Sequence, residues 1–282
     1  MAFEYKGPPL WAGLSLARPL VMGIVNVTPD SFSDAGDLFN QATAIAAARR
    51  QLADGADIID IGGESTRPGA LPVPAAEQLR RVLPVIQALA ADGAVLSVDT
   101  TSADVMRAAI AAGARIVNDV SALEDDSAAL ATVAASDAAV VLMHKRGPPA
   151  TMQRDVAYDR DIVAEVRDYL AARLAACAAA GIDTVRIALD PGIGFGKSLA
   201  GNLALIARLR ELAGLGRPVL AGVSRKSFID KAANVPVPRD RLPGSLAAAL
   251  RALDQGARIV RVHDVPETVQ AIRLWAALNS AG

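Results

Sequence analysis

Short apolar runs recur along the chain at regular spacing, and each is followed by a stretch with helical periodicity. The runs are almost continuously hydrophobic, which is typical of strands in a parallel sheet that is covered on both faces. We expect eight such strands, at Leu20–Val25, Ile58–Ile61, Val95–Val98, Ile116–Val117, Ala139–Met143, Val185–Leu189, Val219–Val223 and Ile259–Val262.

The stretches between the runs are rich in Ala, Leu and Arg, with apolar residues at helical spacing. Gly55, Gly113, Gly181 and Gly256 each stand just before an expected strand, where a glycine commonly ends a helix. The pattern predicts helices over 41–54, 75–91, 103–112, 127–135, 159–180, 201–213, 243–255 and 266–278.

Eight strand-helix units share 282 residues, about 35 residues each. An open, doubly wound sheet is the structural alternative. The count of eight and the lack of a composition break favour a closed α/β barrel, the (β/α)8 or TIM barrel. We therefore expect one domain over residues 1–282, with residues 1–18 as an N-terminal extension or hairpin.

The composition limits the classes of protein. Hydrophobic residues make up 52% of the chain, enough for a large core, and 29 basic against 30 acidic residues leave a formal charge of −1. This balance gives no sign of a surface for nucleic acid or membrane. The single Cys177 is expected to be a buried filler, and it fits a reducing compartment. With no targeting segment visible in the sequence, we expect a cytoplasmic protein.

Polar residues follow every expected strand. In a TIM barrel the active site lies at the carboxyl ends of the strands, so these side chains are expected to gather at one rim. The opposite rim is expected to carry mostly Gly, Ala and isolated charges. The residues at the first rim are Asn26, Asp60, Asp99, Asn118, Asp119, His144, Asp190, Lys226, Arg261 and His263.

This mixed lining indicates a particular ligand chemistry. Carboxylates accept paired hydrogen bonds from a heterocycle rich in N–H groups, and Lys226 has the chemistry to donate to a ring carbonyl. Arg261 and His263 alternate along one strand, point the same way and suit a phosphate or pyrophosphate. The Asn26 amide oxygen is a hard ligand that suits Mg²⁺ shared with such phosphates. The residues alone therefore indicate a nitrogen heterocycle that carries a phosphate leaving group.

Several of these residues also have purely structural interpretations. Asp60 and Asp119 fit helix caps or turn formers, and His144 fits a buried structural histidine. Asp99 fits an N-cap, although the residues Thr100 to Ser102 are available for that task. The run PGIGFGKS (191–198) matches neither a P-loop nor a dinucleotide fingerprint, because its glycines have the wrong spacing.

Eight segments in order resemble the dihydropteroate synthase family, over essentially the whole chain from Met22 to about residue 278. They are MGIVNVTPDSFSD (22–34), DIIDIGGESTRPGA (57–70), SVDT (97–100), IVNDVSAL (116–123), VVLMH (140–144), ALDPGIGFGK (188–197), SRKSFI (224–229) and RVHDV (261–265). The resemblance implies condensation of 6-hydroxymethyl-7,8-dihydropterin pyrophosphate with 4-aminobenzoate, which gives 7,8-dihydropteroate and pyrophosphate in folate synthesis. It also implies competition by sulfonamides.

The resemblance implies a role for each matching residue. The pterin would be bound by Asp99, Asn118, Met143, Asp190, Phe195 and Lys226. Pyrophosphate would be bound by Asn26, Thr66, Arg261 and His263, with Mg²⁺ on Asn26. The 4-aminobenzoate would be bound by Phe32, Asp34, Arg67, Pro68 and Ser227, with its carboxylate at Ser227, which would stand at the N-terminus of a helix. The residues expected to carry the chemistry are Asn26, Asp99, Lys226, Arg261 and His263.

The mechanism that the resemblance implies starts with departure of pyrophosphate, which leaves a pterin-methyl cation for the aniline nitrogen to attack. The alternatives are a pterin-binding paralogue without turnover and a corrinoid-linked methyltransferase barrel. The family also suggests a homodimer through the C-terminal helices, with Trp275 either at that interface or in the core against the barrel.

Overall fold

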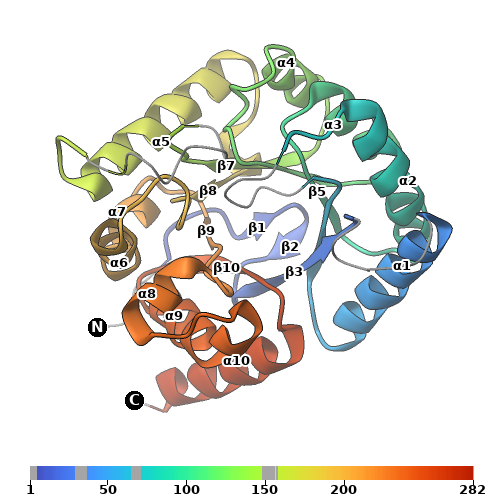
Figure 1. The fold of residues 1–282 in the computed structure, drawn as a ribbon. Coiled ribbons are helices and arrows are strands. Elements are labelled where there is room, and N and C mark those ends of the chain that lie inside the picture. The colour runs from blue at the N-terminus through green and yellow to red at the C-terminus, as the bar shows by residue number, and fades with distance from the viewer. Residues whose placement is uncertain (1–4, 29–36, 65–70, 148–155, 157, 282) are drawn as a thin grey trace.

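Eight parallel strands close into a barrel in this computed structural model, which describes residues 5–28, 37–64, 71–147, 156 and 158–281. Figure 1 shows the barrel along its axis, inside an outer ring of helices. The closed order is β10-β3-β4-β5-β6-β7-β8-β9, so the predicted TIM barrel is confirmed. The strands are β3 (Leu20–Asn26), β4 (Ile58–Gly62), β5 (Leu96–Asp99), β6 (Ile116–Asp119), β7 (Ala139–Met143), β8 (Ile187–Asp190), β9 (Val219–Ala221) and β10 (Ala257–Val262).

The helices follow the strands in sequence and cover the outside of the barrel (Figure 1). Gly55, Gly113, Gly181 and Gly256 have positive φ angles, as expected of residues that end helices. The helices are α1 (Asp37–Ala53), α2 (Ala75–Ala91), α3 (Ala103–Ala111), α4 (Ala129–Ala134), α5 (Ile162–Ala179), α6 (Leu199–Ala207), α7 (Arg210–Ala213), α8 (Ser227–Ala233), α9 (Leu242–Asp254) and α10 (Val265–Ser280).

Two expected elements differ from the structure, and one helix is additional. Val185 does not start a strand, because Asp183 accepts a hydrogen bond from its backbone N–H and begins a 3₁₀ turn over Thr184–Arg186. The helix expected over 201–213 is two helices, and the first begins earlier because the Ser198 side chain caps it. The helical periodicity did not predict the short α8, because seven residues are too few to show a clear period, but Ser227 does begin a helix, as the resemblance implied.

Two hydrophobic cores lie on opposite sides of the barrel wall. The larger core packs outward-facing strand residues such as Ile59, Val98 and Leu189 against the helices. The smaller core fills the barrel with inward-facing residues such as Met22, Ile116 and Leu220. Because both faces of each strand are buried, the strands are almost continuously apolar, as the sequence indicated. Cys177 is fully buried in the larger core, as expected.

A two-stranded antiparallel hairpin, β1 (Leu10–Trp11) and β2 (Leu14–Ser15), lies within the first 18 residues. Trp11 and Leu16 belong to the same core as the side chains at the strand starts, so this segment closes the amino end of the barrel. The Trp11 indole Nε1 donates to the Arg186 carbonyl at 2.9 Å, just before β8. Among the described residues, no helix has the length and apolar character needed to cross a membrane.

Trp11→Ala is expected to destabilise the fold by about 3–5 kcal/mol, since it removes a large buried side chain and leaves a cavity beneath the barrel. Trp11 is 1% exposed, whereas its neighbour Leu10 is 54% exposed. Leu10→Ala is therefore the control and should change the unfolding free energy by less than about 0.5 kcal/mol. Urea unfolding measures both changes. Equal effects of the two variants would contradict the buried role of Trp11.

Candidate active site

The inner face of the barrel changes from apolar to polar along each strand. In β4, β6, β8 and β10 a residue of the inner core is followed two positions later by a polar one, as from Ile58 to Asp60. Successive residues of a strand point to opposite faces, so residues two apart share one face. The inward polar residues near the carboxyl ends are Asp60, Ser97, Asp99, Asn118, Asp190 and Arg261.

We call the carboxyl end of the barrel interior, lined by these inward polar residues, the barrel mouth. Arg261 is its central charge. Its Nε donates to Asp60 Oδ2 at 2.6 Å, and its Nη2 donates to Asp99 Oδ2 at 2.7 Å. Burial lowers the pKa of Arg261, but the two carboxylates outweigh this effect and raise it, so the guanidinium stays charged. Burial raises the pKa of Asp99, while Arg261 opposes the rise.

Asp60 connects two of the residues expected to bind substrate. The Asp60 side chain is fully buried, and its Oδ2 accepts from Asn118 Nδ2 at 3.0 Å as well as from Arg261. This bond fixes the Asn118 amide so that its oxygen is directed away from Asp60. The helix-cap and turn interpretations of Asp60 are therefore wrong, since it is a carboxylate that orders the mouth.

Asp190 and Lys226 form the next part of the mouth. Burial lowers the pKa of Lys226 to about 8, and the nearby Asp190 opposes this decrease. Burial also raises the pKa of Asp190, and Lys226 opposes that rise. Lys226 Nζ donates to the Ile193 carbonyl and lies 4.4 Å from the centre of the Phe195 ring.

The loops after β9 and β10 are tied together. Ser224 Oγ lies 3.0 Å from His263 Nδ1 and accepts from the His263 backbone N–H at 3.2 Å. Arg225 has a positive φ and pairs with Asp264, with Nε 3.0 Å from Oδ2. These bonds hold Lys226 and His263 in neighbouring loops, and they were not predicted. Ser227, also expected in the site, is exposed at the first position of α8.

The remaining expected residues divide into two groups. Asn26 is the last residue of β3. A Cβ added to Gly62 would lie 3.5 Å from Asn26 Oδ1 and 3.6 Å from Asp99 Cβ, so the Asn26 and Asp99 side chains both lie beside Gly62. Met143 is buried at the end of β7. The other five residues lie outside the described residues, namely Phe32, Asp34, Thr66, Arg67 and Pro68.

The structural interpretations are correct for two other rim residues. Asp119 accepts from Ser121 Oγ and from the backbone N–H groups of Ser121 and Leu123, so it forms a turn. His144 is buried beside Lys197, with Nδ1 3.0 Å from Nζ. Asp99 is not an N-cap: Asp126 accepts from the first N–H of α3 instead.

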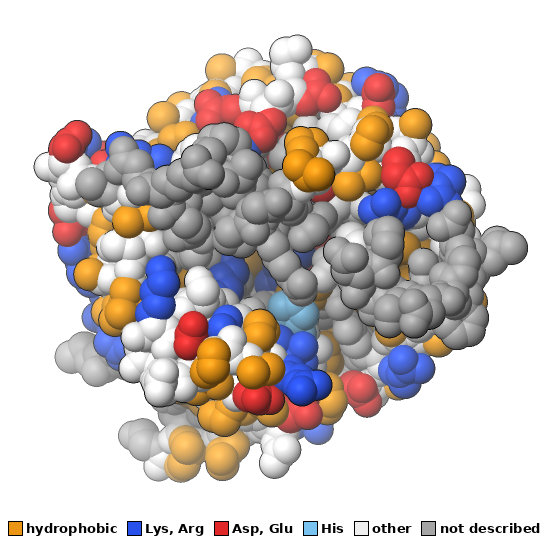
Figure 2. Space-filling view, viewed as in Figure 1, with side chains coloured by type: hydrophobic (Ala, Val, Ile, Leu, Met, Phe, Trp, Pro, Cys, Tyr) orange, Lys and Arg blue, Asp and Glu red, His pale blue; other side chains and the backbone are white. Residues whose placement is uncertain are grey.

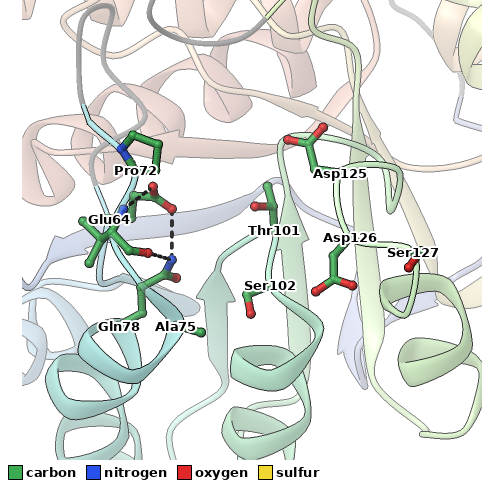
Figure 3. A pocket seen from close by; sticks show the side chains of 10 residues that line it. Glu64, Pro72, Ala75, Gln78, Thr101, Ser102, Asp125, Asp126 and Ser127 are labelled. Carbon is green, nitrogen blue, oxygen red and sulfur yellow. Dashed lines mark hydrogen bonds between the residues drawn. The ribbon is translucent and has the colours of Figure 1, made fainter.

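Outside the mouth, a cavity of about 420 Å³ opens between the segments that follow β4, β5 and β6. Figure 3 shows Glu64 and Gln78 on one side of it and Asp125 and Asp126 on the other. Gln78 donates to Glu64 and accepts from Thr100, which follows Asp99. This network fixes Glu64 at the end of the segment after β4, and among the described residues none of the expected substrate contacts lines the cavity.

Basic side chains after β7 have structural partners. Lys145 forms an ion pair with Asp125, and Arg146 lies over the Tyr158 ring at 4.7 Å. These contacts explain the positions of two positive charges to which the sequence assigned no role.

Figure 2 shows the face of the molecule that is turned to the viewer in Figure 1, with a histidine near its centre and basic side chains beside it.

The family described as "Pterin binding enzyme" matches residues 22–263. The dihydropteroate synthase of Escherichia coli K12 is 48% identical over 269 residues, which cover 95% of this chain and 94% of that protein. The Synechocystis dihydropteroate synthase is 45% identical over 280 residues, which cover 98% and 96%.

Solved structures agree with these relatives. Xanthomonas albilineans dihydropteroate synthase with 4-aminobenzoic acid has a TM-score of 0.89 and 51% identity, covering 95% of this chain and 96% of that one. The same enzyme in complex with 7,8-dihydropteroate has a TM-score of 0.86 and 48% identity, covering 94% and 95%. Yersinia pestis dihydropteroate synthase in a sulfonamide drug complex has a TM-score of 0.89 and 46% identity, covering 99% and 100%.

His144 is expected to stay neutral from pH 5 to pH 8, because burial, with smaller effects of Lys197 and Arg146, lowers its pKa to about 3. An unfolded histidine titrates near pH 6.5 and then binds a proton that folded His144 does not. The contribution of His144 therefore destabilises the fold as the pH falls below about 6.5. NMR titration of the imidazole signals measures its pKa directly.

The chain contains two histidines, so in His263→Gln the one remaining imidazole signal belongs to His144. A remaining signal that titrates between pH 5 and pH 8 would contradict the assignment.

Proposed function

The chain belongs to the dihydropteroate synthase family, a family of transferases, and from this premise we propose its reaction and the roles of its residues. The proposed reaction condenses 6-hydroxymethyl-7,8-dihydropterin pyrophosphate with 4-aminobenzoate and releases 7,8-dihydropteroate and pyrophosphate. The observation that carries it is the mixed barrel mouth, where Asp99, Asn118 and Asp190 supply acceptors beside the donors Lys226 and Arg261.

In the proposed pterin site, the N–H groups of the heterocycle donate hydrogen bonds to Asp99, Asn118 and Asp190. The bond from Asn118 Nδ2 to Asp60 supports this role, since it leaves the amide oxygen as the acceptor. Lys226 donates to the ring carbonyl, and Met143 and Phe195 pack against the ring. These three acceptors are buried, and they favour a ligand with matching donors because an unmatched ligand would leave them unpaired.

Arg261, His263 and Thr66 are proposed to bind the pyrophosphate. The Nε and Nη2 atoms of Arg261 are used by Asp60 and Asp99, whereas its Nη1 makes no hydrogen bond within the described residues. A guanidinium with one free edge suits a phosphate oxygen. The raised pKa of Arg261 supports this role, because the positive charge persists as the leaving group gains negative charge.

Mg²⁺ is the proposed metal, held by Asn26 and by oxygens of the pyrophosphate. Mg²⁺ commonly uses few protein ligands together with substrate phosphates, and the hard amide oxygen of Asn26 in the mouth fits that pattern. Within the described residues, no group of three or more His, Cys, Asp or Glu side chains could hold a metal. When bound, the metal supplies positive charge that stabilises the departing pyrophosphate.

The proposed chemistry breaks the bond between the pterin methylene carbon and the pyrophosphate oxygen. The oxygen keeps the electron pair, and the dihydropterin ring delocalises the positive charge that remains on the methylene. Arg261 and His263 stabilise the developing negative charge of the leaving group. The neutral aniline nitrogen of 4-aminobenzoate then forms the new C–N bond and loses its proton to the pyrophosphate or to solvent.

The 4-aminobenzoate site is proposed at Phe32, Asp34, Arg67, Pro68 and Ser227. Ser227 is exposed at the first position of α8, next to Lys226, which supports a contact with the carboxylate end of this substrate. Sulfonamides are proposed to compete there.

We also propose that the protein is a cytoplasmic homodimer. Leu274 and Leu278 of α10 are 62% and 68% exposed, which supports an interface at the C-terminal helix. Trp275 is half-buried against the larger core and donates to Asp254, so it reaches both the core and the surface. The free thiol of Cys177 supports a reducing compartment.

The purified protein is expected to form dihydropteroate and release pyrophosphate when the pterin pyrophosphate and 4-aminobenzoate are both present, and to do so fastest when Mg²⁺ is added. Removing Mg²⁺ with a chelator should slow turnover by at least about tenfold, because the leaving group loses its added stabilisation. Coupled pyrophosphate detection with product chromatography measures both products. Absence of aminobenzoate-dependent dihydropteroate would refute the proposed function.

Lys226→Ala is expected to weaken binding of the pterin pyrophosphate about 10- to 100-fold, since it removes a charged donor to the ring. Lys231→Ala is the matched control, because Lys231 is exposed on α8 a few residues away. Calorimetry of the pterin substrate and thermal melting of both variants separate binding from folding. Full pterin affinity in Lys226→Ala would contradict the assigned role.

A further inference from the structure

The glycine-rich loop between β8 and α6, residues 191–198, lies directly on the segment that follows β7. Gly192 has a φ of +68°, and a Cβ at this position would be 1.9 Å from the His144 carbonyl oxygen. Gly196 has a φ of +66°, and its Cβ would be 2.5 Å from the Arg146 carbonyl oxygen. Neither position accepts a side chain, so these two glycines allow the loop backbone to approach the segment after β7 closely.

Lys197 fastens this loop from the inside. Its side chain is 1% exposed, and its Nζ lies 3.1 Å from the His144 carbonyl oxygen, 3.0 Å from the Phe195 carbonyl oxygen and 3.0 Å from His144 Nδ1. A buried lysine with three partners is fully satisfied, because an ammonium has three donors. Lys197 therefore joins the loop to the end of β7.

Further hydrogen bonds hold the same loop from its outer side. Asn202 Oδ1 accepts from the Gly194 N–H at 2.6 Å, and Asn202 Nδ2 donates to the Lys197 and Ser198 carbonyl oxygens. The Tyr158 hydroxyl donates to the Gly196 carbonyl at 2.8 Å. The loop is thus bonded to α6 through Asn202 and to the segment after β7 through Tyr158 and through its own Lys197, and these bonds restrict its alternative conformations.

The loop presents two groups to Lys226. The Ile193 carbonyl accepts from Lys226 Nζ, and the Phe195 ring lies 4.4 Å from the same atom. A Cβ on Gly194 would come within 3.1 Å of Lys226 Cδ, so the loop backbone also contacts the lysine stem. The loop therefore sets where the Lys226 ammonium stands relative to Asp190.

We propose that Lys197 is a positioning residue for the pterin site, which it orders by holding the loop that places Phe195 and Lys226. This inference rests on the proposed function, since it assumes that these two residues contact the pterin. Lys197 is not a catalytic residue, because its Nζ is enclosed and all three of its hydrogen-bonding positions are occupied by the protein.

The tether does not depend on one charge state. Burial lowers the pKa of Lys197 to about 7, while Asp190 opposes this decrease. The ammonium donates to both carbonyl oxygens and to His144 Nδ1. The neutral amine keeps two donors for the carbonyl oxygens, and its lone pair can accept from a protonated Nδ1 of neutral His144. The loop therefore stays fastened through neutral pH.

The test compares Lys197→Met, which keeps the length of the side chain but has no donor, with the exposed Lys231→Met as the control. The intact protein is titrated with the pterin pyrophosphate by calorimetry, and KM is measured for both substrates. Lys197→Met is expected to weaken pterin binding about 10- to 100-fold, since a displaced binding group loses much of its effect. The KM for 4-aminobenzoate should change less than about twofold, because the Lys197 side chain bonds to His144 and Phe195 and not to Ser227, the proposed 4-aminobenzoate contact that the structure describes.

Hydrogen exchange supplies a second measurement that needs no ligand. The amides of Gly194 and Phe195 are expected to exchange faster in Lys197→Met, whereas those of Ile187 and Leu189 in β8 should not. Unchanged loop exchange together with unchanged pterin affinity would overturn the proposal. Equal losses for both substrates and for the melting temperature would also overturn it, as they indicate general destabilisation. Failure of the wild-type protein to bind pterin would refute the proposed function, while loop exchange still decides the tether.

Two further variants keep the test decisive if Lys197→Met folds poorly. Lys197→Gln retains a buried amide donor and is expected to restore part of the pterin affinity. In a Phe195→Ala background, removal of the Lys197 donors should cost clearly less pterin affinity than in the wild type, because both changes act through one loop. Strictly additive costs in this double-mutant cycle would contradict the proposal.

Discussion

The ion-pair cluster of Arg261 with Asp60 and Asp99 is the interaction on which the barrel mouth depends. A guanidinium inside a barrel loses several kcal/mol of hydration free energy unless carboxylates and hydrogen bonds compensate for it. Here two carboxylates from neighbouring strands do so at 2.6 and 2.7 Å. Asp60 also binds the Asn118 amide, and Thr100, which follows Asp99, is bonded to Gln78. Neutralising one cation therefore orders the ends of β4, β5, β6 and β10 together.

The repeating apolar runs predicted the barrel because a parallel strand that is buried on both faces needs apolar residues at nearly every position. The prediction failed where a local hydrogen bond outweighed hydrophobicity. Val185 is apolar, but the Asp183 side chain turns the backbone there, and Ser198 starts α6 before the helical period becomes visible. The periodicity missed α8 because its seven residues scarcely define a period, whereas the family resemblance placed Ser227 correctly at the start of a helix.

The sequence predicted which strand residues meet at the carboxyl end of the barrel better than it predicted the bonds between them. Because side chains alternate between the two faces of a strand, the sequence is enough to predict that Asp99, Asn118 and Arg261 all point into the barrel. The pairing of Asp60 with Arg261 joins residues 201 positions apart, and no local pattern contains that information. Lys197 is a second example. The chain has only five lysines, which makes each of them notable, but the burial of Lys197 depends on the path of the glycine-rich loop and could not be predicted from the sequence.

The mouth also explains how an anionic leaving group could be stabilised without rearranging the protein. Asp60 and Asp99 hold Arg261 through Nε and Nη2, so the guanidinium plane is fixed by folding and not by the substrate. Fixed charges stabilise a developing charge better than mobile ones, because no reorientation is needed as the bond breaks. The two carboxylates reduce the net attraction for the pyrophosphate ground state. In the proposed reaction this reduction favours the transition state, since the charge that grows on the departing oxygen finds Arg261 already oriented while the intact substrate is not bound too tightly.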